Sequence, residues 1–309
     1  MMIIQAAGGL GNQMQQYALY HKLKHLGRDV KMDLTWFEDP AMQENVLAKR
    51  SLELRLFEGL PIDACTRREK DALTGGDGAF GKLRRKLGGA SVFTESRMYH
   101  PEILEMTEGY LTGYFACEKY YADVLEELRG LFVFPGETGE NAQRNAALMR
   151  EMSDPSAGSV SIHIRRGDYL DSENAGLLGG ICTPQYYEGC VRCVKEKARS
   201  ALKFYIFSDD PDYARSLHFG DSADENIVID WNTGQNSFRD MQLMSCCRYN
   251  ICANSTFSFW GARLNGRKDK VMLRPLVHKN TQPEDPALMH DLWKNWILIG
   301  RDGIIYEDV

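Results

Sequence analysis

The sequence lacks a long uninterrupted apolar segment. Residues 1–21 carry no side-chain charge, but four glutamines, one asparagine and three glycines interrupt them. Each buried amide costs about 1–3 kcal/mol or more in lipid, so this stretch makes a poor membrane span. A basic leading segment and the apolar core of a signal peptide are also missing. We therefore expect the protein in the cytoplasm.

Basic residues are not in excess over acidic ones. The 37 lysines and arginines are outnumbered by 43 aspartates and glutamates, which gives a formal net charge of −6. This balance excludes a basic surface over the whole protein, so we expect no nucleic-acid partner. Any anion site must be local.

Cysteines are few and lack the spacing of a metal site. Of the eight cysteines, Cys190 and Cys193 form a lone C-x-x-C with no second pair at zinc spacing. A chain of 309 residues can bury an adequate core without disulfides. We therefore expect the cysteines to be small buried hydrophobic residues and not metal ligands or redox groups.

Neither a repeat of fixed period nor an unusual composition is present. Apolar residues make up 43% and charged residues 26% of the chain, as in an ordinary soluble globular protein. At about 150 residues per domain, the length predicts two domains. The turn-forming sequence SDPSAG at 153–158 predicts the boundary, which gives domains 1–155 and 156–309.

Strand and helix patterns alternate along the chain. An apolar strand over 2–6, a glycine turn, a helix over 13–26 and a strand over 30–33 form a β-α-β opening. Further predicted strands cover 109–115, 159–164, 203–207, 227–229, 250–253 and 270–273, and further predicted helices cover 117–132, 141–152, 184–199, 211–217, 237–247 and 257–264. This alternation predicts an α/β fold with a parallel sheet, whose ligands lie beyond the carboxyl ends of the strands.

The first candidate site follows the strand over 159–164, where residues 163–169 read HIRRGDY. In an extended segment, His163 and Arg165 point to one face and Arg166 to the other. Two guanidinium groups at a strand end suit a diphosphate, because each forks onto phosphate oxygens and keeps its charge. A surface ion pair with Asp168 is the alternative.

A second candidate is the sequence NSTFS at 254–258, between a strand and a helix. Its hydroxyls and the free N–H groups of the helix suit a phosphate. Ordinary helix capping by Ser255 or Ser258 is the alternative.

A third candidate is the strand end at Ser208 and Asp209, where a carboxylate could accept hydrogen bonds from a base or a sugar. The following Asp210-Pro211-Asp212 fits a D-x-D metal-binding pattern. Because Asp followed by Pro also begins helices, we expect Asp210 to be a helix cap.

A fourth candidate is the glycine turn at 8–13. Gly9 and Gly11 supply the G-x-G of a dinucleotide fingerprint, and Asp33 lies about where its ribose-binding acid belongs. Met14 occupies the third glycine position, and no Lys-Ser/Thr follows, so this is not a P-loop. An NAD(P)-dependent oxidoreductase is the alternative that rests on these residues. Even without a dinucleotide, the turn can offer backbone N–H groups and the Asn12 amide to a ligand.

Taken together, these segments resemble the ordered motifs of bacterial α-1,2-fucosyltransferases, glycosyltransferase family 11. The motifs lie at 8–14, 113–115, 118–120, 163–169, 207–210, 240–245 and 254–262. The resemblance implies a GT-B-like architecture of two Rossmann-like domains facing across a cleft, with the acceptor on the N-terminal side and GDP-fucose on the C-terminal domain. It also implies GDP-β-L-fucose as donor, the 2-hydroxyl of a terminal galactose as acceptor, inversion at the anomeric carbon and no required metal or other cofactor.

The resemblance assigns roles to individual residues. Arg165 would bind the diphosphate and stabilise it as it leaves, and Asp168 is our candidate for the general base. Other substrate-binding positions are Gly9, Gly11, Asn12, His163, Arg166, Ser208, Asp209, Asp240, Asn254, Ser255, Thr256, Phe257 and Ser258. The chain departs from the family pattern at Gln15, at Ala116-Cys117 and at Phe259. The first two changes leave the acceptor open, so transfer to another acceptor hydroxyl is an alternative. A non-catalytic fucose- or nucleotide-binding module is a separate alternative.

A short basic run contains Lys82, Arg84, Arg85 and Lys86. Cationic side chains attract anionic lipid headgroups by about 1 kcal/mol per charge at the surface. We therefore expect at most a peripheral contact with the inner face of a membrane, where a lipid-linked acceptor would lie. A solvated loop is the alternative.

Overall fold

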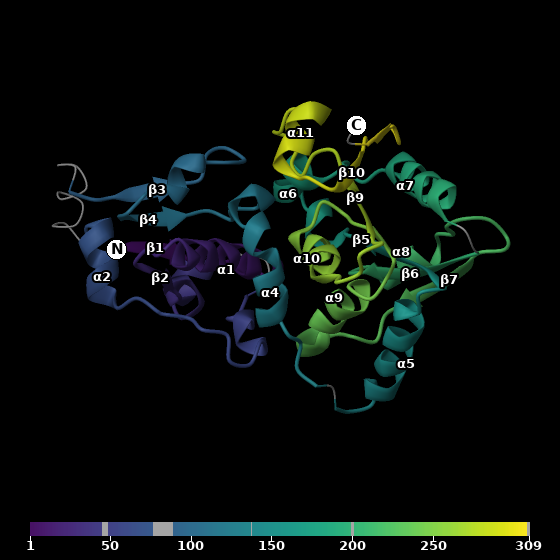
Figure 1. Cartoon of the computed structure of the whole chain (residues 1–309), viewed down its shortest axis with the longest axis horizontal. Helices are drawn as coiled ribbons and strands as arrows, with labels where there is room; N and C mark the ends of the chain where they lie inside the picture. Colours follow the sequence, from purple (N-terminus) through teal and green to yellow (C-terminus); the bar gives the residue numbers. More distant parts are fainter. Residues whose placement is uncertain (45–48, 77–88, 137, 199–200, 308–309) are drawn as a thin grey trace. The chain divides into compact units, whose positions relative to one another are not determined.

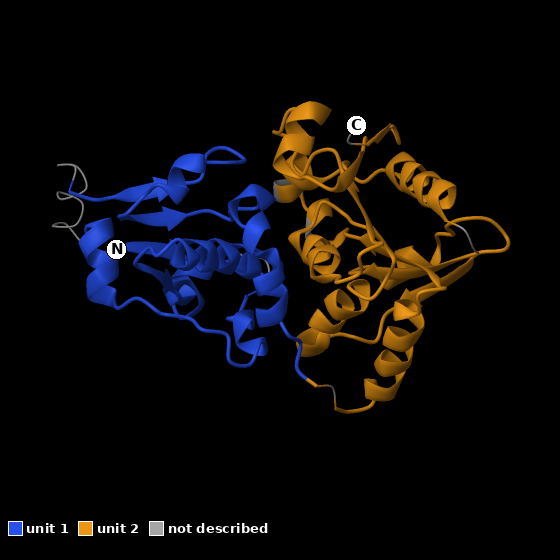
Figure 2. Ribbon diagram, in the orientation of Figure 1, with its two compact units in different colours: residues 1–135 blue, residues 136–309 orange. Residues whose placement is uncertain are grey.

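The computed structural model describes residues 1–309 apart from 45–48, 77–88, 137, 199–200 and 308–309. The chain divides into two compact units, residues 1–135 and 136–309 (Figure 2). The basic run at 82–86 lies outside the described residues. Within the described part, no helix is long and apolar enough to cross a membrane.

Unit 1 contains a four-stranded parallel sheet in the order β2-β1-β4-β3 (Figure 1). Its strands are β1 (Met2–Gln5), β2 (Val30–Asp33), β3 (Val92–Thr94) and β4 (Gly109–Thr112), and its α-helices are α1 (Leu10–His25), α2 (Arg67–Thr74) and α4 (Leu125–Leu131). The predicted β-α-β opening is confirmed. The helix predicted over 117–132 is broken at Tyr121, whose φ of −142° is not helical, and only α4 forms a continuous α-helix there.

Unit 2 contains a seven-stranded sheet in the order β11-β10-β9-β8-β5-β6-β7, parallel except for the pair β10–β11. Its strands are β5 (Gly158–Ile164), β6 (Leu202–Ser208), β7 (Glu225–Ile229), β8 (Tyr249–Ile251), β9 (Val271–Pro275), β10 (Trp296–Ile299) and β11 (Ile305–Tyr306). Its helices are α5 (Ala142–Ser153), α6 (Ser172–Leu178), α7 (Pro184–Lys197), α8 (Pro211–Arg215), α9 (Phe238–Met244), α10 (Thr256–Leu264) and α11 (Pro286–Leu292). The predicted α/β class with two Rossmann-like domains is confirmed.

Two apolar cores cover the two faces of this sheet. Alternate side chains of β5 and β6, such as Ile162 and Ile206, pack with α7 on one face. Tyr205 and Phe207 of β6 point to the other face and pack with residues of α5 and α9. Successive side chains of a strand point to opposite faces, and an apolar core covers each face, so every residue of β5 is buried. The same alternation fixes the directions of the residues just beyond β5.

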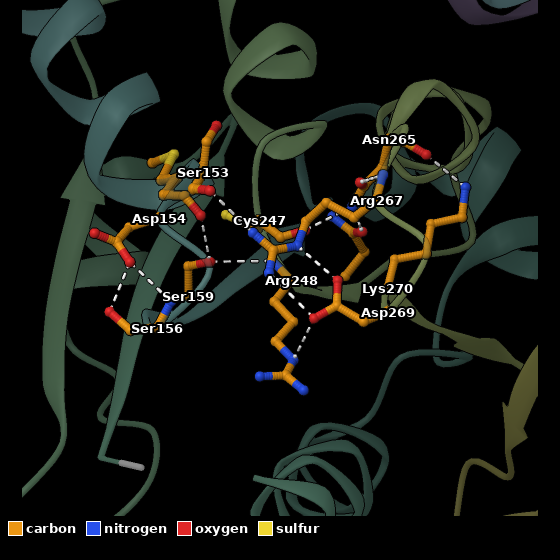
Figure 3. Close-up of polar contacts among 12 residues, drawn as sticks. Ser153, Asp154, Ser156, Ser159, Cys247, Arg248, Asn265, Arg267, Asp269 and Lys270 are labelled. Atoms are coloured by element: carbon orange, nitrogen blue, oxygen red, sulfur yellow. Dashed lines mark hydrogen bonds and ion pairs between the residues drawn. The ribbon is translucent and has the colours of Figure 1, made fainter. Parts of the chain in front are cut away.

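The turn predicted as the domain boundary lies inside unit 2. The Ser159 hydroxyl donates to the Met152 carbonyl (2.7 Å) and accepts from the Arg248 N–H (3.0 Å), and Arg267 Nη1 donates to the Ser153 carbonyl (3.1 Å; Figure 3). These contacts tie α5 to β5, and they join this region to the segments before β8 and β9. The boundary between the units falls at residue 135, whereas the sequence predicted it at residue 155. Turn-forming residues mark a reversal of the chain whether or not a domain ends there.

Candidate functional site

The candidate site of unit 2 lies where the strand order of its sheet reverses. The chain proceeds outward from β5 to β6 and β7, then returns to β8 on the other side of β5. In parallel sheets of this order, ligands bind beyond the carboxyl ends of the two strands at the reversal. Residues 165–167 follow β5 and residues 252–255 follow β8, so two of the predicted motifs meet at this point.

The two arginines after β5 have different partners. Arg165 forms an ion pair with Asp209 (Nη1–Oδ2 3.1 Å) and remains about a quarter exposed. Arg166 lies over the Tyr213 ring of α8, with its guanidinium carbon 3.7 Å from the ring centroid, and its Nε donates to Asp210 (3.1 Å). Arg166 therefore supports α8, whereas Arg165 presents a charged group at the sheet edge.

Asp209 is positioned by the close approach of Gly167. Its Oδ1 accepts the Arg166 backbone N–H (2.9 Å) while Oδ2 pairs with Arg165. A Cβ atom on Gly167 would lie 2.5 Å from Asp209 Oδ2. Ser208 supports the same turn, because its hydroxyl accepts the Asp210 N–H (3.0 Å). The absence of a side chain at 167 thus allows the Asp209–Arg165 pair to form.

Asp210 caps α8, as predicted. Its Oδ1 accepts the Tyr213 N–H (3.0 Å), and Pro211 occupies the first turn. Asp212 pairs with Arg215 (2.7 Å). Both carboxylates of the D-x-D pattern therefore have partners in the protein, and no group of three potential metal ligands occurs within the described part of the chain.

The serine capping that was the alternative to a phosphate site at the N-terminus of α10 does not involve Ser255. The Ser255 side chain makes no capping hydrogen bond, and no acidic residue lies in the first turn. The Ser258 hydroxyl is buried and donates to the Ser255 carbonyl (3.2 Å). The positive end of the helix dipole lies at this first turn of α10, where it would favour an external anion.

Asn254 joins three segments around the site and is itself buried. Its Nδ2 donates to the carbonyls of Leu178 (3.0 Å) and His278 (3.2 Å), and its own carbonyl accepts from the Tyr169 hydroxyl (2.9 Å). The predicted ligand-binding amide is thus occupied by protein partners. Asn254 holds the loop after β8 in place.

His163 is a neutral imidazole in the folded protein. It is buried against Phe257, with ring centroids 5.9 Å apart, and its Nδ1 has no hydrogen-bond partner among the described residues. Burial, together with the positive charge of Arg165, lowers the pKa of His163 to about 3. His163 can offer a hydrogen bond to a ligand but no positive charge near neutral pH.

Asp240 belongs to a buried polar network in the first turn of α9. It accepts a hydrogen bond from Asn232 Nδ2 (2.9 Å), and Asn232 in turn accepts one from Asn145 Nδ2 of α5 (2.8 Å). Burial raises the pKa of Asp240 to about 7, and the charge of Asp230 adds to this shift. The Ser237 side chain makes no capping hydrogen bond at the start of α9, and the Asp240 carboxylate turns to Asn232.

Asp168, the candidate base, can be placed only in part. Its backbone lies in the 3₁₀ turn Gly167–Leu170, and its side chain lies outside the described residues. Its role as a base therefore stays a prediction.

The glycine turn belongs to unit 1 and surrounds the start of α1. Gly8 has φ +81°, a conformation that favours glycine, and a Cβ there would lie 2.7 Å from Asn12 Nδ2. Gly9 is the N-cap of α1, so it supplies no capping side chain, and Gly11 is buried in the first turn. The fourth candidate thus lies on a separate unit from the other three.

Asp33 does not fit a ribose-binding role. It is fully buried, pairs with Lys70 (2.9 Å) and accepts hydrogen bonds from the hydroxyls of Tyr110 (2.6 Å) and Thr35 (2.7 Å). These partners, with the backbone N–H of Thr35, hold its pKa low despite burial. Because both carboxylate oxygens are occupied, the dinucleotide interpretation loses the acid on which it depended.

Sequence reasoning missed the residues that hold the charged groups in place. Tyr213 could have been predicted from its place in the sequence. It is the third residue after the Asp210 cap, where a helical side chain lies near the end of the preceding strand, β6. Asn232 and Asn145 had no local signal, since their partners lie far apart in the sequence.

Known proteins share extensive similarity with the chain. The model of the family "Glycosyl transferase family 11" matches residues 102–300. An alpha-1,2-colitosyltransferase of Escherichia coli is 30% identical, over 89% of this chain and 91% of its own length. The O-antigen biosynthesis glycosyltransferase WbnK of Escherichia coli is 28% identical, over 87% and 92%. Among solved structures, NodZ alpha-1,6-fucosyltransferase soaked with GDP-fucose matches with a TM-score of 0.44 and 17% identity, over 85% of this chain and 92% of its own.

Proposed function

The chain belongs to glycosyltransferase family 11, and from this premise we propose that it transfers L-fucose, with inversion, from GDP-β-L-fucose to the 2-hydroxyl of a terminal β-galactoside in a glycan. The observation that carries the proposal is the place of Arg165. Its guanidinium stands just beyond β5, held by Asp209, beside the strand that leads into the N-terminus of α10. This arrangement suits a diphosphate.

The same groups account for the chemistry of the donor. When the anomeric C–O bond breaks, the electron pair leaves with GDP and the sugar becomes oxocarbenium-like. Positive groups that are already in position stabilise the charge on the departing diphosphate without rearrangement. In the proposal, Arg165 and the first turn of α10 supply that charge, and neutral His163 supplies a hydrogen bond.

Transfer to defined acceptors tests the proposal directly. The protein is incubated with GDP-fucose and a panel of β-galactosides, and the products are subjected to linkage analysis. We expect an α-1,2-linked fucose on the terminal galactose. Fucose at a different hydroxyl would move the proposal to another acceptor linkage, and no transfer to any acceptor would overturn it.

Nucleotide binding gives a second, independent test. Calorimetry with GDP, UDP and NAD should give the tightest binding for GDP, both with and without EDTA. Tighter binding of NAD would restore the oxidoreductase alternative, and loss of GDP binding with EDTA would require a metal that the proposal omits.

A second candidate donor is supported by the relative that is 30% identical, whose name specifies colitose, the 3-deoxy analogue of L-fucose. The reacting groups would be the same, and only the contact to the 3-hydroxyl would differ. Competition between GDP-fucose and GDP-colitose at equal concentration decides between the two donors by the ratio of products.

A further inference from the structure

Pairing between β5 and β8 stops at the reversal of strand order in unit 2. The last pair joins Ile162 to Ile251, so His163 and Cys252 are the first residues beyond the paired region. The loop after β5 carries Arg165, and the loop after β8 leads into α10. Because cross-strand bonds between β5 and β8 end before these loops, the position of one loop relative to the other depends on further contacts.

Two neighbouring tyrosines of α7 supply contacts at these positions. The Tyr187 hydroxyl donates to the His163 carbonyl (3.0 Å), and the Tyr186 hydroxyl donates to the Cys252 carbonyl (2.5 Å). Both tyrosines are buried in one apolar core of the sheet, where their rings meet edge to face with centroids 5.1 Å apart. Since consecutive residues of a helix are fixed relative to each other, one turn of α7 holds the ends of both strands.

The first turn of α7 is itself anchored. Thr183 is its N-cap, with an Oγ1 that accepts the Tyr186 N–H (3.1 Å), and Pro184 occupies the first helical position. The Thr183 hydroxyl also donates to the carbonyl of Arg301, between β10 and β11. The turn that carries the two tyrosines is therefore in place without any ligand.

A third tyrosine, Tyr169, joins the two loops directly. Its ring lies beside the Arg165 guanidinium, with 5.7 Å between the guanidinium carbon and the ring centroid, and its hydroxyl donates to the Asn254 carbonyl (2.9 Å). Asn254 lies two residues before Thr256, the first residue of α10. One side chain thus contacts both the arginine and the segment that leads into the helix.

We propose that Tyr169, Tyr186 and Tyr187 are positioning residues that fix the Arg165 guanidinium relative to the first turn of α10. This inference rests on the proposed function, in which these two positive groups bind the same diphosphate. The three hydroxyls act through the carbonyls that they hold and do not need to touch the substrate. Because the two groups stabilise the departing charge only at the correct spacing, a displacement of about 1 Å costs about 10²-fold in rate.

Replacing each of Tyr169, Tyr186 and Tyr187 by phenylalanine tests the proposal, since each change removes one hydroxyl and keeps the ring. With GDP-fucose saturating, we expect kcat to fall about 10–10²-fold in each variant. Tyr249→Phe is the matched control. The Tyr249 hydroxyl also donates to a backbone carbonyl from within the same core, that of Lys197 (3.4 Å), but at the opposite end of α7. The control should keep the wild-type kcat, and an equal loss in the control would overturn the inference.

A double-mutant cycle separates positioning from a general loss of stability. If Tyr187 acts through Arg165, Tyr187→Phe lowers kcat/KM for GDP-fucose at least threefold less in an Arg165→Ala background than in the wild type. Losses within threefold of each other in the two backgrounds would overturn the inference, as would a kcat within threefold of the wild type in all three tyrosine variants. The wild-type assay tests the proposed function first, because a wild-type protein inactive with GDP-fucose overturns that function and this inference with it.

Discussion

Asp209 holds Arg165 and the backbone of Arg166 with the two oxygens of one carboxylate. Oδ2 lies 3.1 Å from Arg165 Nη1, and Oδ1 accepts the Arg166 N–H at 2.9 Å. The guanidinium of Arg165 is therefore oriented before any ligand arrives. A preoriented hydrogen-bond donor costs less side-chain entropy on binding, which would favour the departing diphosphate of the proposed reaction.

Arg165→Ala should remove most of the turnover. With GDP-fucose saturating, we expect kcat to fall about 10²–10³-fold, because a fixed charge on the leaving group is lost. The midpoint of thermal unfolding should change little, since Arg165 is partly exposed. Steady-state kinetics check this, with Arg67→Ala, an exposed arginine of α2, as the control. Turnover near that of the wild type would contradict the role of Arg165.

Gly167→Ala should damage the site through Asp209. The added Cβ would lie 2.5 Å from Asp209 Oδ2, so the carboxylate must move away from Arg165. We expect a destabilisation of about 1–3 kcal/mol and a higher KM for the donor. Gly130→Ala is the control, because a Cβ at Gly130 has open space. An unchanged KM would mean that the Asp209–Arg165 pair tolerates the methyl group.

Asn254→Ala should destabilise the loop after β8. The change leaves the carbonyls of Leu178 and His278 without their donor. An unsatisfied buried polar group costs about 1–3 kcal/mol, and urea unfolding measures the difference. Asn236→Ala, on an exposed side chain, provides the comparison. Equal stability of the two variants would contradict the joining role of Asn254.

Asp240 should make stability depend on pH. The pKa of Asp240 is raised to about 7 in the folded protein, against about 3.9 for an unfolded aspartate, so the folded state binds the proton more tightly. Its contribution is fully present below pH about 4 and is lost as the pH rises through 7. Asp240→Asn should therefore be more stable than the wild type at pH 8 and lose that advantage by pH 4. Urea unfolding at several pH values measures this difference, and a difference independent of pH would refute the assignment.

The basic run at 82–86 should determine any binding to membranes. Each cationic side chain contributes about 1 kcal/mol at an anionic surface. Replacing Lys82, Arg84, Arg85 and Lys86 by alanine should abolish co-sedimentation with anionic vesicles and leave transfer to soluble acceptors unchanged. Identical co-sedimentation of the wild type and the four-alanine variant would contradict a membrane contact through this run.

The sequence predicted the features whose causes are local. A buried-strand pattern over 159–164 identified β5, and alternation along the extended chain placed His163 and Arg166 on opposite faces, where Phe257 and Tyr213 contact them. Aspartate followed by proline identified the cap of α8. Each of these signals lies within a few residues of the structure that it predicts.

Features with distant causes were not predicted. Nothing near Asn254 indicates that its amide binds carbonyls 76 and 24 residues away. The backbone N–H of Glu53 donates to the side chain of Gln13, forty residues earlier, and no local motif indicates this contact. The strands β10 and β11, which extend the sheet beyond β9, were also not predicted from the sequence, nor were α6 and α11.

Strand β11 has only two residues, yet it changes which backbone groups are exposed at this edge of the sheet of unit 2. It pairs antiparallel with Leu298 and Ile299 of β10. Without it, this side of the sheet would present a row of open backbone donors and acceptors to any other sheet of the same kind. A short, reversed segment therefore protects a largely parallel enzyme domain from self-association at that edge.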